Sequence, residues 1–441
     1  MKRLFTPAAL SAALALSLAP ATGAWAAQNI SITPAMSPVI YQVCGNATDT
    51  ATGDCAATNA SDGAAATPGN LVTVQSGAQA QGDIYGRRDE TTTAATTGTN
   101  NAVLINGNAA FNNTVYGAMA SSDADGYNAK AALNQVTISG AGAAAFMAIG
   151  GAATAQSGTA TTPITASATQ NQVLMQGGAA DGASGGVAHC EDDCTAEARG
   201  NTVSVTGGTV STGFAGGEAV VSGNGAATVS GNKVSVTGGS AQGDIYGGAA
   251  FSDSGAATVS NNTVEIGGSA SIDPSTNLHG GYADVNTGTI ISTGNALALG
   301  IGGVAVHDVN SFQVMNFSVP AATLTAGDPM LRVSGTADIG GVDINVTVAG
   351  SLAVGDQVLL IDASGAGGAL TGTPASANSP QGYQLEIVGT PATSRQLIVQ
   401  VKSLPPAATS SAAAVPMLGE TALALLALLL AGGAMAAMRR R

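Results

Sequence analysis

Three aspartates are the residues of this sequence best suited to acid–base chemistry. Asp83, Asp244 and Asp284 each lie next to a tyrosine-containing motif, and paired carboxylates on one face of a fold are what the hydrolysis of a glycosidic bond requires. The same motif recurs along the chain, so an aspartate that recurs with it is better explained as a structural residue. We therefore expect these aspartates to be structural.

The other groups that could take part in catalysis are also scattered. The chain has three histidines far apart in sequence, His189, His279 and His307. It has no Gly-x-Ser-x-Gly elbow, no His-Glu-x-x-His motif and no phosphate-binding loop. The sequence thus favours a protein that is not an enzyme and that needs no cofactor or catalytic metal.

The N-terminal residues have the pattern of a secretory signal peptide. Lys2 and Arg3 make a positive start, an apolar run follows over residues 8–19, and small residues flank a cleavage site between Ala26 and Ala27. We expect residues 1–26 to be removed on export.

The four cysteines fit an exported chain. Cys44 and Cys55 form one close pair and Cys190 and Cys194 another, and an even number of cysteines in an exported protein indicates disulfides. Local pairing is favoured because an elongated fold would hold the two pairs apart. A metal site within residues 189–194 is the alternative, but zinc sites usually need a second ligand pair. We predict disulfides, with the Cys190–Cys194 segment on an exposed loop.

Composition excludes several classes of protein. Of 441 residues, 61 are glycine, 3% are aromatic and 9% are charged, which is unlike an ordinary globular enzyme and also unlike a highly charged disordered chain. Without residues 1–26 and 415–441 the chain carries 8 basic and 26 acidic residues, a net charge of −18. Such a surface repels nucleic acid. We attribute the excess of alanine to the two apolar ends and to short loops.

A repeat of about 31 residues dominates the middle of the chain. The motif Asn-x-Val-x-apolar occurs seven times, with start-to-start spacings of 30 to 37 residues, beginning at Asn70, Asn101, Asn134, Asn171, Asn201, Asn232 and Asn262. Each unit also has a Gly-containing second motif, of which GDIYG around Tyr85 and GDIYGG around Tyr246 are the clearest. A fixed period with alternating β-branched residues predicts stacked coils. The fold class is therefore all-β, a parallel β-helix (β-solenoid) of about 31-residue coils over residues 69–308.

The repeated residue types have definite uses in such coils. The asparagines would either stack as a hydrogen-bonded ladder or simply favour turns, and the sequence leaves both open. Gly-Gly pairs would stand where a positive φ or a close backbone approach excludes a Cβ atom. The four motif tyrosines are expected to pack against the coils rather than to bind sugars, and they are Tyr85, Tyr116, Tyr246 and Tyr282.

The segments around the repeats divide the rest of the chain. Residues 27–68, with Cys44 and Cys55, form an N-terminal loop or cap. Residues 309–402 are strand-like but lack the repeat, so we expect a β-rich C-terminal cap made of irregular final coils or of a small sandwich. Residues 403–414, rich in Pro, Ser and Ala, read as a linker.

The repeats resemble those of a known family. GDIYGG together with Asn-x-Val-x-Val strands is similar to the passenger regions of bacterial autotransporter adhesins, and residues 312–401 resemble the segment that precedes their translocator barrel. No barrel-length run of membrane strands follows, so we expect this chain not to translocate itself.

The last residues resemble a sorting signal of the IPTL-CTERM and PEP-CTERM type. Such a signal has a short Pro-containing motif, an apolar helix and a basic end, and here these are supplied by Val415, Pro416, Met417, Leu418, Gly419 and Glu420, by residues 421–438, and by Arg439, Arg440 and Arg441. The resemblance implies an envelope sorting enzyme and the membrane as partners of residues 415–441. A plain C-terminal transmembrane anchor is the alternative.

Together these features favour an exported protein at the cell envelope, outer membrane or surface of a Gram-negative bacterium. A non-catalytic, adhesive or structural β-solenoid is the expected function, with a surface or matrix polysaccharide, or a host or neighbouring cell surface, as its ligand. A carbohydrate-active β-helix enzyme is the alternative, and it rests on fold analogy alone.

Overall fold

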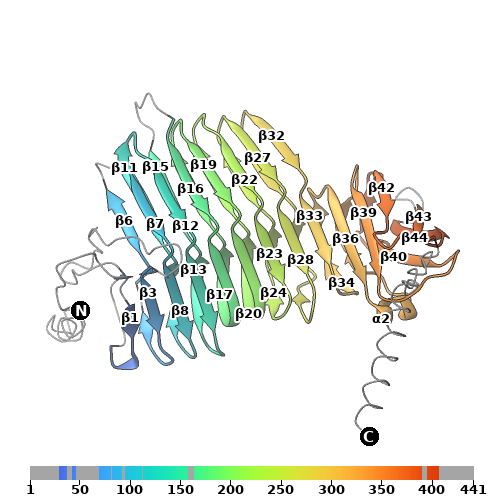
Figure 1. Cartoon of the computed structure of the whole chain (residues 1–441), viewed down its shortest axis with the longest axis horizontal. Coiled ribbons are helices and arrows are strands. Elements are labelled where there is room, and N and C mark those ends of the chain that lie inside the picture. Colours follow the sequence, from blue (N-terminus) through green and yellow to red (C-terminus); the bar gives the residue numbers. More distant parts are fainter. Residues whose placement is uncertain are drawn as a thin grey trace, which may run out of the picture.

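The computed structural model describes residues 29–36, 42–45, 69–80, 82–91, 95–111, 113–156, 163–389 and 395–406. The predicted signal peptide with Ala26 and Ala27, Cys55, and the whole of the predicted sorting signal lie outside these residues. The described chain is an all-β parallel β-solenoid of about nine turns with almost no helix, and its strands stack along the long axis (Figure 1). The predicted all-β parallel β-solenoid is thus confirmed. Among the helices of the described residues, none is long and apolar enough to cross a membrane.

One 25-stranded sheet wraps around the main core, and we call this part of each coil the first lobe. Strands of the Asn-x-Val type form one side of it: β1 (Asn29–Ile32), β3 (Leu71–Val74), β8 (Ala102–Asn106), β13 (Gln135–Ser139), β17 (Gln172–Ser184), β20 (Thr202–Ala215), β23 (Lys233–Val236), β28 (Thr263–Ile266), β33 (Ala296–Leu299), β36 (Val314–Val319), β39 (Asp343–Val348) and β42 (Ser376–Asn378).

Strands of the GDIYG type form the other side of the first lobe. They are β2 (Val43–Cys44), β5 (Ile84–Tyr85), β10 (Thr114–Tyr116), β14 (Ala144–Ile149), the second halves of β17 and β20, β25 (Asp244–Tyr246), β30 (Leu278–His279), β35 (Val309–Asn310), β38 (Thr336–Asp338) and β41 (Ala369–Thr371). Short strands mark the turn between the two sides: β4 (Gln79–Ala80), β9 (Ala110–Phe111), β24 (Ser240–Ala241) and β29 (Ser271–Ile272).

Two seven-stranded parallel sheets form a second lobe beside the first. One contains β6 (Arg88–Thr91), β11 (Met119–Asp125), β15 (Ala152–Gln156), β18 (Val187–Glu191), β21 (Glu218–Ser222), β26 (Ala249–Ser252) and β31 (Tyr282–Val285). The other contains β7 (Thr96–Thr99), β12 (Ala129–Ala132), β16 (Thr165–Thr169), β19 (Thr195–Arg199), β22 (Ala227–Ser230), β27 (Ala256–Ser260) and β32 (Thr289–Thr293).

The two lobes have cores of different composition. Valine and isoleucine fill the first lobe, where Val203 and Val205 of β20, for example, are fully buried at alternate positions. The second lobe is filled mainly by alanine, with Ala196 and Ala198 of β19 fully buried. Side chains that end at Cβ let two sheets lie close together. Much of the alanine is therefore core, which corrects its assignment to termini and loops.

The coils lose their second lobe after residue 308. The chain passes from β35 to β36 through a short turn in which Ser311 has φ 61° and Phe312 is buried. Beyond this turn β36 pairs in parallel with β33, and β39 with β36, so the first lobe continues alone. Residues 309–378 thus form further coils.

An antiparallel segment closes the stack. The third face of the last coils consists of β34 (Val304–Val306), β37 (Leu331–Val333) and β40 (Gln357–Asp362), and β40 then pairs antiparallel with β44 (Gln396–Ser403), which pairs with β43 (Gln384–Ile387). A short helix, α2 (Ala321–Ala326), ends at Gly327 with φ 67°, and one 3₁₀ turn spans Pro34–Met36. The last strands pair antiparallel, so the edge that ends the stack differs from the parallel edges of the repeats.

Candidate functional site

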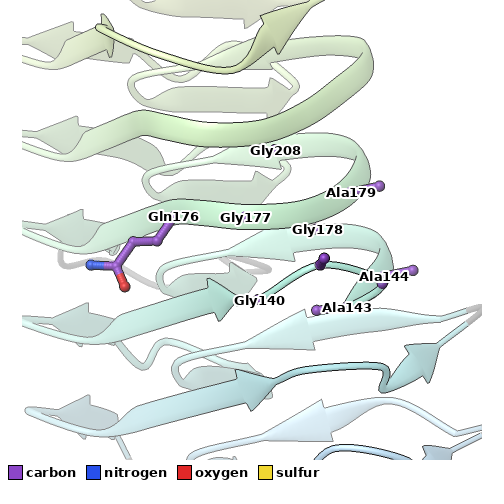
Figure 2. Close-up of a pocket in the computed structure, with 10 residues that line it drawn as sticks. Gly140, Ala143, Ala144, Gln176, Gly177, Gly178, Ala179 and Gly208 are labelled. Atoms are coloured by element: carbon purple, nitrogen blue, oxygen red, sulfur yellow. The ribbon is translucent and has the colours of Figure 1, made fainter.

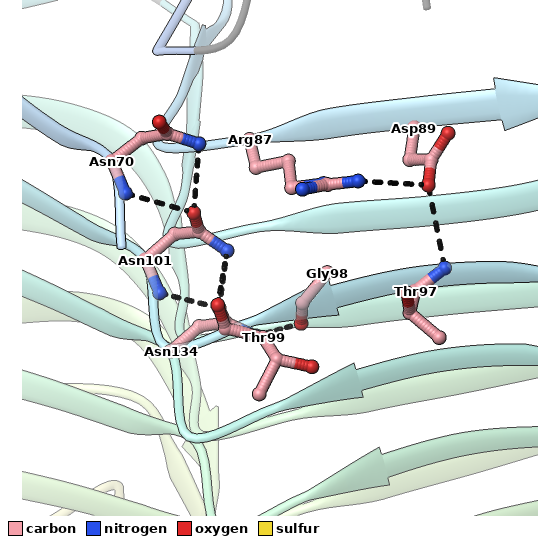
Figure 3. Close-up of polar contacts among 8 residues, drawn as sticks. All are labelled: Asn70, Arg87, Asp89, Thr97, Gly98, Thr99, Asn101 and Asn134. Atoms are coloured by element: carbon pink, nitrogen blue, oxygen red, sulfur yellow. Dashed lines mark hydrogen bonds and ion pairs between the residues drawn. The ribbon is translucent and has the colours of Figure 1, made fainter. Parts of the chain in front are cut away.

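A ladder of buried asparagines runs along the waist where the two lobes meet. Asn134, for example, accepts hydrogen bonds at Oδ1 from the backbone N–H (2.9 Å) and Nδ2 (3.1 Å) of Asn101. Its own Nδ2 donates to Asn171 Oδ1 (2.9 Å) and to the carbonyl of Gly98 (2.7 Å). Figure 3 shows the first three members. Of the two uses considered for the motif asparagines, the ladder is the one present.

The ladder extends one coil beyond the motif and then ends in a glutamine. Asn295 follows Asn262, and it is as buried as the seven motif asparagines. Gln313 Oε1 then accepts from the backbone N–H (2.9 Å) and Nδ2 (3.2 Å) of Asn295. The ladder thus stops at the coil that lacks a second lobe.

Gly-Gly pairs line the opposite side of the same waist. A Cβ atom on Gly186 would lie 2.5 Å from Asn201 Oδ1, and one on Gly217 would lie 2.6 Å from Asn232 Oδ1. Neither glycine has a positive φ. Close approach to the asparagine amide, and not a left-handed backbone, is therefore why glycine is required.

Two stacked tyrosines lie near the N-terminal end of the rod, where the GDIYG-type strands of the first lobe lead into the second lobe. We call this position in each coil the corner. The rings of Tyr85 and Tyr116 are parallel, with centroids 4.8 Å apart, and the Arg88 guanidinium lies 5.4 Å from the Tyr85 ring centroid. Tyr85 donates its hydroxyl hydrogen bond to Asp83 Oδ2 (3.1 Å). Burial, followed by the Asp83 charge, raises the pKa of both tyrosines, so both phenols are neutral at physiological pH.

A second aromatic group lies at the same corner five coils further on. Tyr246 stacks on His279 with centroids 4.6 Å apart, and Tyr282 packs edge-on against both. Burial and the Asp244 charge raise the pKa of Tyr246 to about 12. Burial lowers the pKa of His279, whose Nδ1 lies 2.7 Å from Asn310 Oδ1.

Tyr282, grouped with the motif tyrosines from the sequence, does not share their position in the coil. In register, His279 pairs with Tyr246, whereas Tyr282 pairs with Ala249 on the second lobe. Sequence reasoning missed His279 because it looked for a tyrosine in this coil. The signal that could have found it is its place directly before Gly280-Gly281, which matches that of Tyr246 before Gly247-Gly248.

The candidate aspartates are not brought together. Asp83 Oδ1 accepts from the backbone N–H of Thr114 in the next coil (3.0 Å), and Asp244 Oδ1 accepts from the N–H of Asn277 (3.1 Å). The registers place Asp83 and Asp244 five coils apart, which is about 24 Å. Asp284 lies exposed on β31. Paired carboxylates in glycosidases are roughly 5–9.5 Å apart, so Asp83 and Asp244 cannot form such a pair.

The histidines likewise lie on different surfaces. His189 is on β18 of the second lobe, His279 belongs to the aromatic group, and His307 Nδ1 lies 3.2 Å from Ser334 Oγ in the last coils. In the part of the chain that the structure describes, no three His, Cys, Asp or Glu side chains gather closely enough to hold a metal ion.

The predicted Cys190–Cys194 disulfide is present, with a Cα–Cα distance of 5.8 Å. It closes a turn in which Asp192 has φ 66°. Around it, Gln156 Nε2 donates to Glu191 Oε2 (2.6 Å) and Asp193 accepts from the backbone N–H of Asn224 (3.1 Å). Sulfur atoms in a disulfide are not available as thiolate ligands. The disulfide therefore cross-links this turn, and the two cysteines do not form the alternative metal site. Cys44 is also disulfide-bonded.

Glu218 is a titratable group that sequence reasoning missed. It lies on β21 at the corner, between Val187 and Ala249 of the neighbouring coils. Burial raises the pKa of this carboxyl. Only stacking of the coils shows that its neighbours are apolar.

An open pocket lies at the outer turn of the first lobe, where consecutive coils differ in width (Figure 2). Its volume is about 530 Å³. Glycines and alanines line it, including Gly142, Gly178 and Ala179, and Gln176 is its one polar side chain. The pocket therefore holds no acid, base or nucleophile.

The rings of the two aromatic groups form stacked surfaces at the corner. The aromatic groups are neutral at physiological pH, and their aspartates are bonded to the next coil. No protein-family model, curated protein or solved structure matches the chain.

Proposed function

We propose that this chain is an exported, non-catalytic protein of a Gram-negative cell envelope, whose β-solenoid serves as an adhesive or structural rod. The observation that supports this best is how the repeated polar side chains are used. Ladder asparagines and motif aspartates bond to the next coil rather than converging on a common cavity. Such a molecule is suited to presenting a long, repeated surface.

Export is supported by both sequence and disulfide. Residues 1–26 have the three parts of a signal peptide, and a disulfide such as Cys190–Cys194 persists in oxidising compartments outside the cytosol. In this proposal residues 415–441 direct the chain to the envelope, where a sorting enzyme recognises them or they insert into the membrane. The rod then binds a polysaccharide or a neighbouring cell.

Cell fractionation tests the location. The full chain and a variant that lacks residues 415–441 are expressed in a Gram-negative host, and protease added to intact cells reports exposure. We expect the full chain at the surface and the shortened chain in the periplasm or medium. Equal cytosolic retention of both would contradict export. A mature chain that still ends at Arg441 by mass spectrometry would indicate a plain membrane anchor rather than removal of residues 415–441 by a sorting enzyme.

A polysaccharide screen separates the adhesive function from an enzymatic one. The purified protein should bind to immobilised polysaccharide or to cells, and it should release no soluble sugars from them. Sugar release that is lost in an Asp244→Asn variant with an unchanged circular dichroism spectrum would overturn the non-catalytic proposal.

A further inference from the structure

The N-terminal end of the second lobe is closed by charged side chains. Asp89 of β6 occupies the register position of the buried Ala120, where it accepts from Arg87 (3.3 Å) and from the backbone N–H of Thr97 (3.4 Å). Figure 3 shows this group. A charge that points inward at an edge strand disfavours the addition of another strand.

The C-terminal end of the same lobe is open. In the described residues β31 and β32 are the last strands of their sheets, and the first lobe continues past them through β36 and β39 (Figure 1). Ile290 pairs in register with the fully buried Ala257, yet it is 51% exposed, and the neighbouring Ile291 is 46% exposed. The alanine core therefore ends in uncovered isoleucine.

The size of this end decides what kind of partner fits. β32 has five residues, or about 17 Å of strand, and packed sheets are at most about 10 Å apart in an alanine core, so the end offers less than roughly 200 Å². Stable dimers bury about 800 Å² on each partner. A second copy of the chain is thus too large a partner for so small a surface, whereas one extended segment matches it.

Charge decides the chemistry of that segment. Between Glu265 and Arg332 the sequence has no lysine or arginine but four aspartates, Asp273, Asp284, Asp308 and Asp328. Asp284 lies exposed on β31 itself. A partner strand that brings lysine or arginine beside its apolar residues is complementary to this end, and an acidic one is not.

We propose that β32 is a docking edge for an extended, basic segment of a partner protein, apolar at alternate residues. The segment adds to β32 as a further strand through main-chain hydrogen bonds. Its inward side chains cover Ile290, and its positive charge is attracted by the acidic residues at this end of the rod, of which Asp284 is exposed on the neighbouring sheet. This site is independent of the proposed location and of the aromatic corner.

Binding of labelled peptides to the purified full chain tests the proposal. The probe is a short peptide in which valine alternates with lysine, and its two controls replace lysine by glutamate or carry N-methylated amides along one edge. We expect the basic peptide alone to bind by fluorescence anisotropy, more weakly as salt increases. Equal binding of the N-methylated peptide would overturn strand addition, and equal binding of the acidic peptide would overturn the charge argument.

Variants locate the site. Ile290→Ser should weaken binding about tenfold, because an isoleucine contact is lost. Phe146→Ser removes a side chain of similar exposure, 53%, on the other lobe and should leave binding unchanged. Unaltered binding by Ile290→Ser would show that this edge is not the docking site. So would protection from hydrogen exchange, before peptide is added, of the β32 amides that point away from β27.

Discussion

Each ladder asparagine satisfies buried polar groups in the neighbouring coils on both sides. Asn201 Oδ1 accepts from the backbone N–H and the Nδ2 of Asn171, while its Nδ2 donates to Asn232 Oδ1 and to the carbonyl of Ala168. An aspartate would place an acceptor where Nδ2 now donates, and so would face two further acceptors. The amide is thus required for its donor and its acceptor together.

Removing one ladder amide should destabilise the fold strongly. Asn201→Ala leaves buried donors and acceptors without partners, at about 1–3 kcal/mol each, so we expect the free energy of unfolding to fall by about 3 kcal/mol or more in chemical denaturation. Asn224→Ala is the matched control, since Asn224 is exposed, and it should change that energy by less than about 0.5 kcal/mol. Similar losses in both variants would refute the importance of the ladder.

Glu218 should make stability depend on pH. Burial raises the pKa of its carboxyl in the folded protein, so the folded state holds this proton more tightly than the unfolded chain does. Ionisation therefore destabilises the fold. Glu218→Gln should raise the free energy of unfolding at pH 7, and the gain should disappear below about pH 4, where both states of the wild type are protonated. A gain that is the same at both pH values would contradict this.

At the scale of elements, two motifs that lie 14 to 20 residues apart in sequence form one joint. The second glycine of each Gly-Gly pair at the waist contacts the side chain of the asparagine that begins the next Asn-x-Val strand, as Gly151 contacts Asn171. Where Ala118 replaces that glycine, Gly98 faces it across the waist. In this coil the glycine of the joint therefore stands on the other strand, and room for the asparagine ladder is kept.

A methyl group in this joint should be costly. Gly217→Ala places Cβ 2.6 Å from Asn232 Oδ1, and overpacking of this kind costs about 1–3 kcal/mol. We expect thermal unfolding at a clearly lower temperature. A Cβ atom on Gly267 would meet nothing within 4 Å, so Gly267→Ala should unfold close to the wild-type temperature. If both variants unfolded at the same lowered temperature, the loss of glycine itself, and not the contact with Asn232, would be responsible.

For the whole molecule, stability is shared between neighbouring coils. Strand pairing in each sheet joins each coil to the one before and the one after, so the rod behaves as a one-dimensional stack. The first and last coils lack one neighbour, so each end that is closed is closed by residues of its own. Gln313 and Phe312 end the waist, antiparallel β44 ends the first lobe, and Arg87 with Asp89 closes one end of the second.

Removal of one whole coil should therefore be tolerated. Deleting residues 202–232 joins Asn201 to Lys233, and both ladder and strand registers continue because Thr202 pairs with Lys233 in the intact protein. We expect a cooperative β-sheet fold whose long dimension by X-ray scattering is shorter by about 5 Å. Deleting residues 202–216, about half a coil, breaks the register and should not fold. Loss of folding in the first variant would show that the coils are not equivalent.

The sequence by itself determined the period, the parallel β-solenoid and the Cys190–Cys194 disulfide, because spacing and alternation are local properties that each coil repeats. It left the asparagine ladder undecided, since a turn and a ladder favour the same residue. Only the tertiary structure decided the alanine core of the second lobe, the place of His279 beside Tyr246, the burial of Glu218 and the open edge at Ile290. These depend on which residues of successive coils stand in register. Register is set by pairing between residues about thirty positions apart in sequence. Alanine and glycine have short side chains and show no hydrophobic pattern from which that pairing could be predicted.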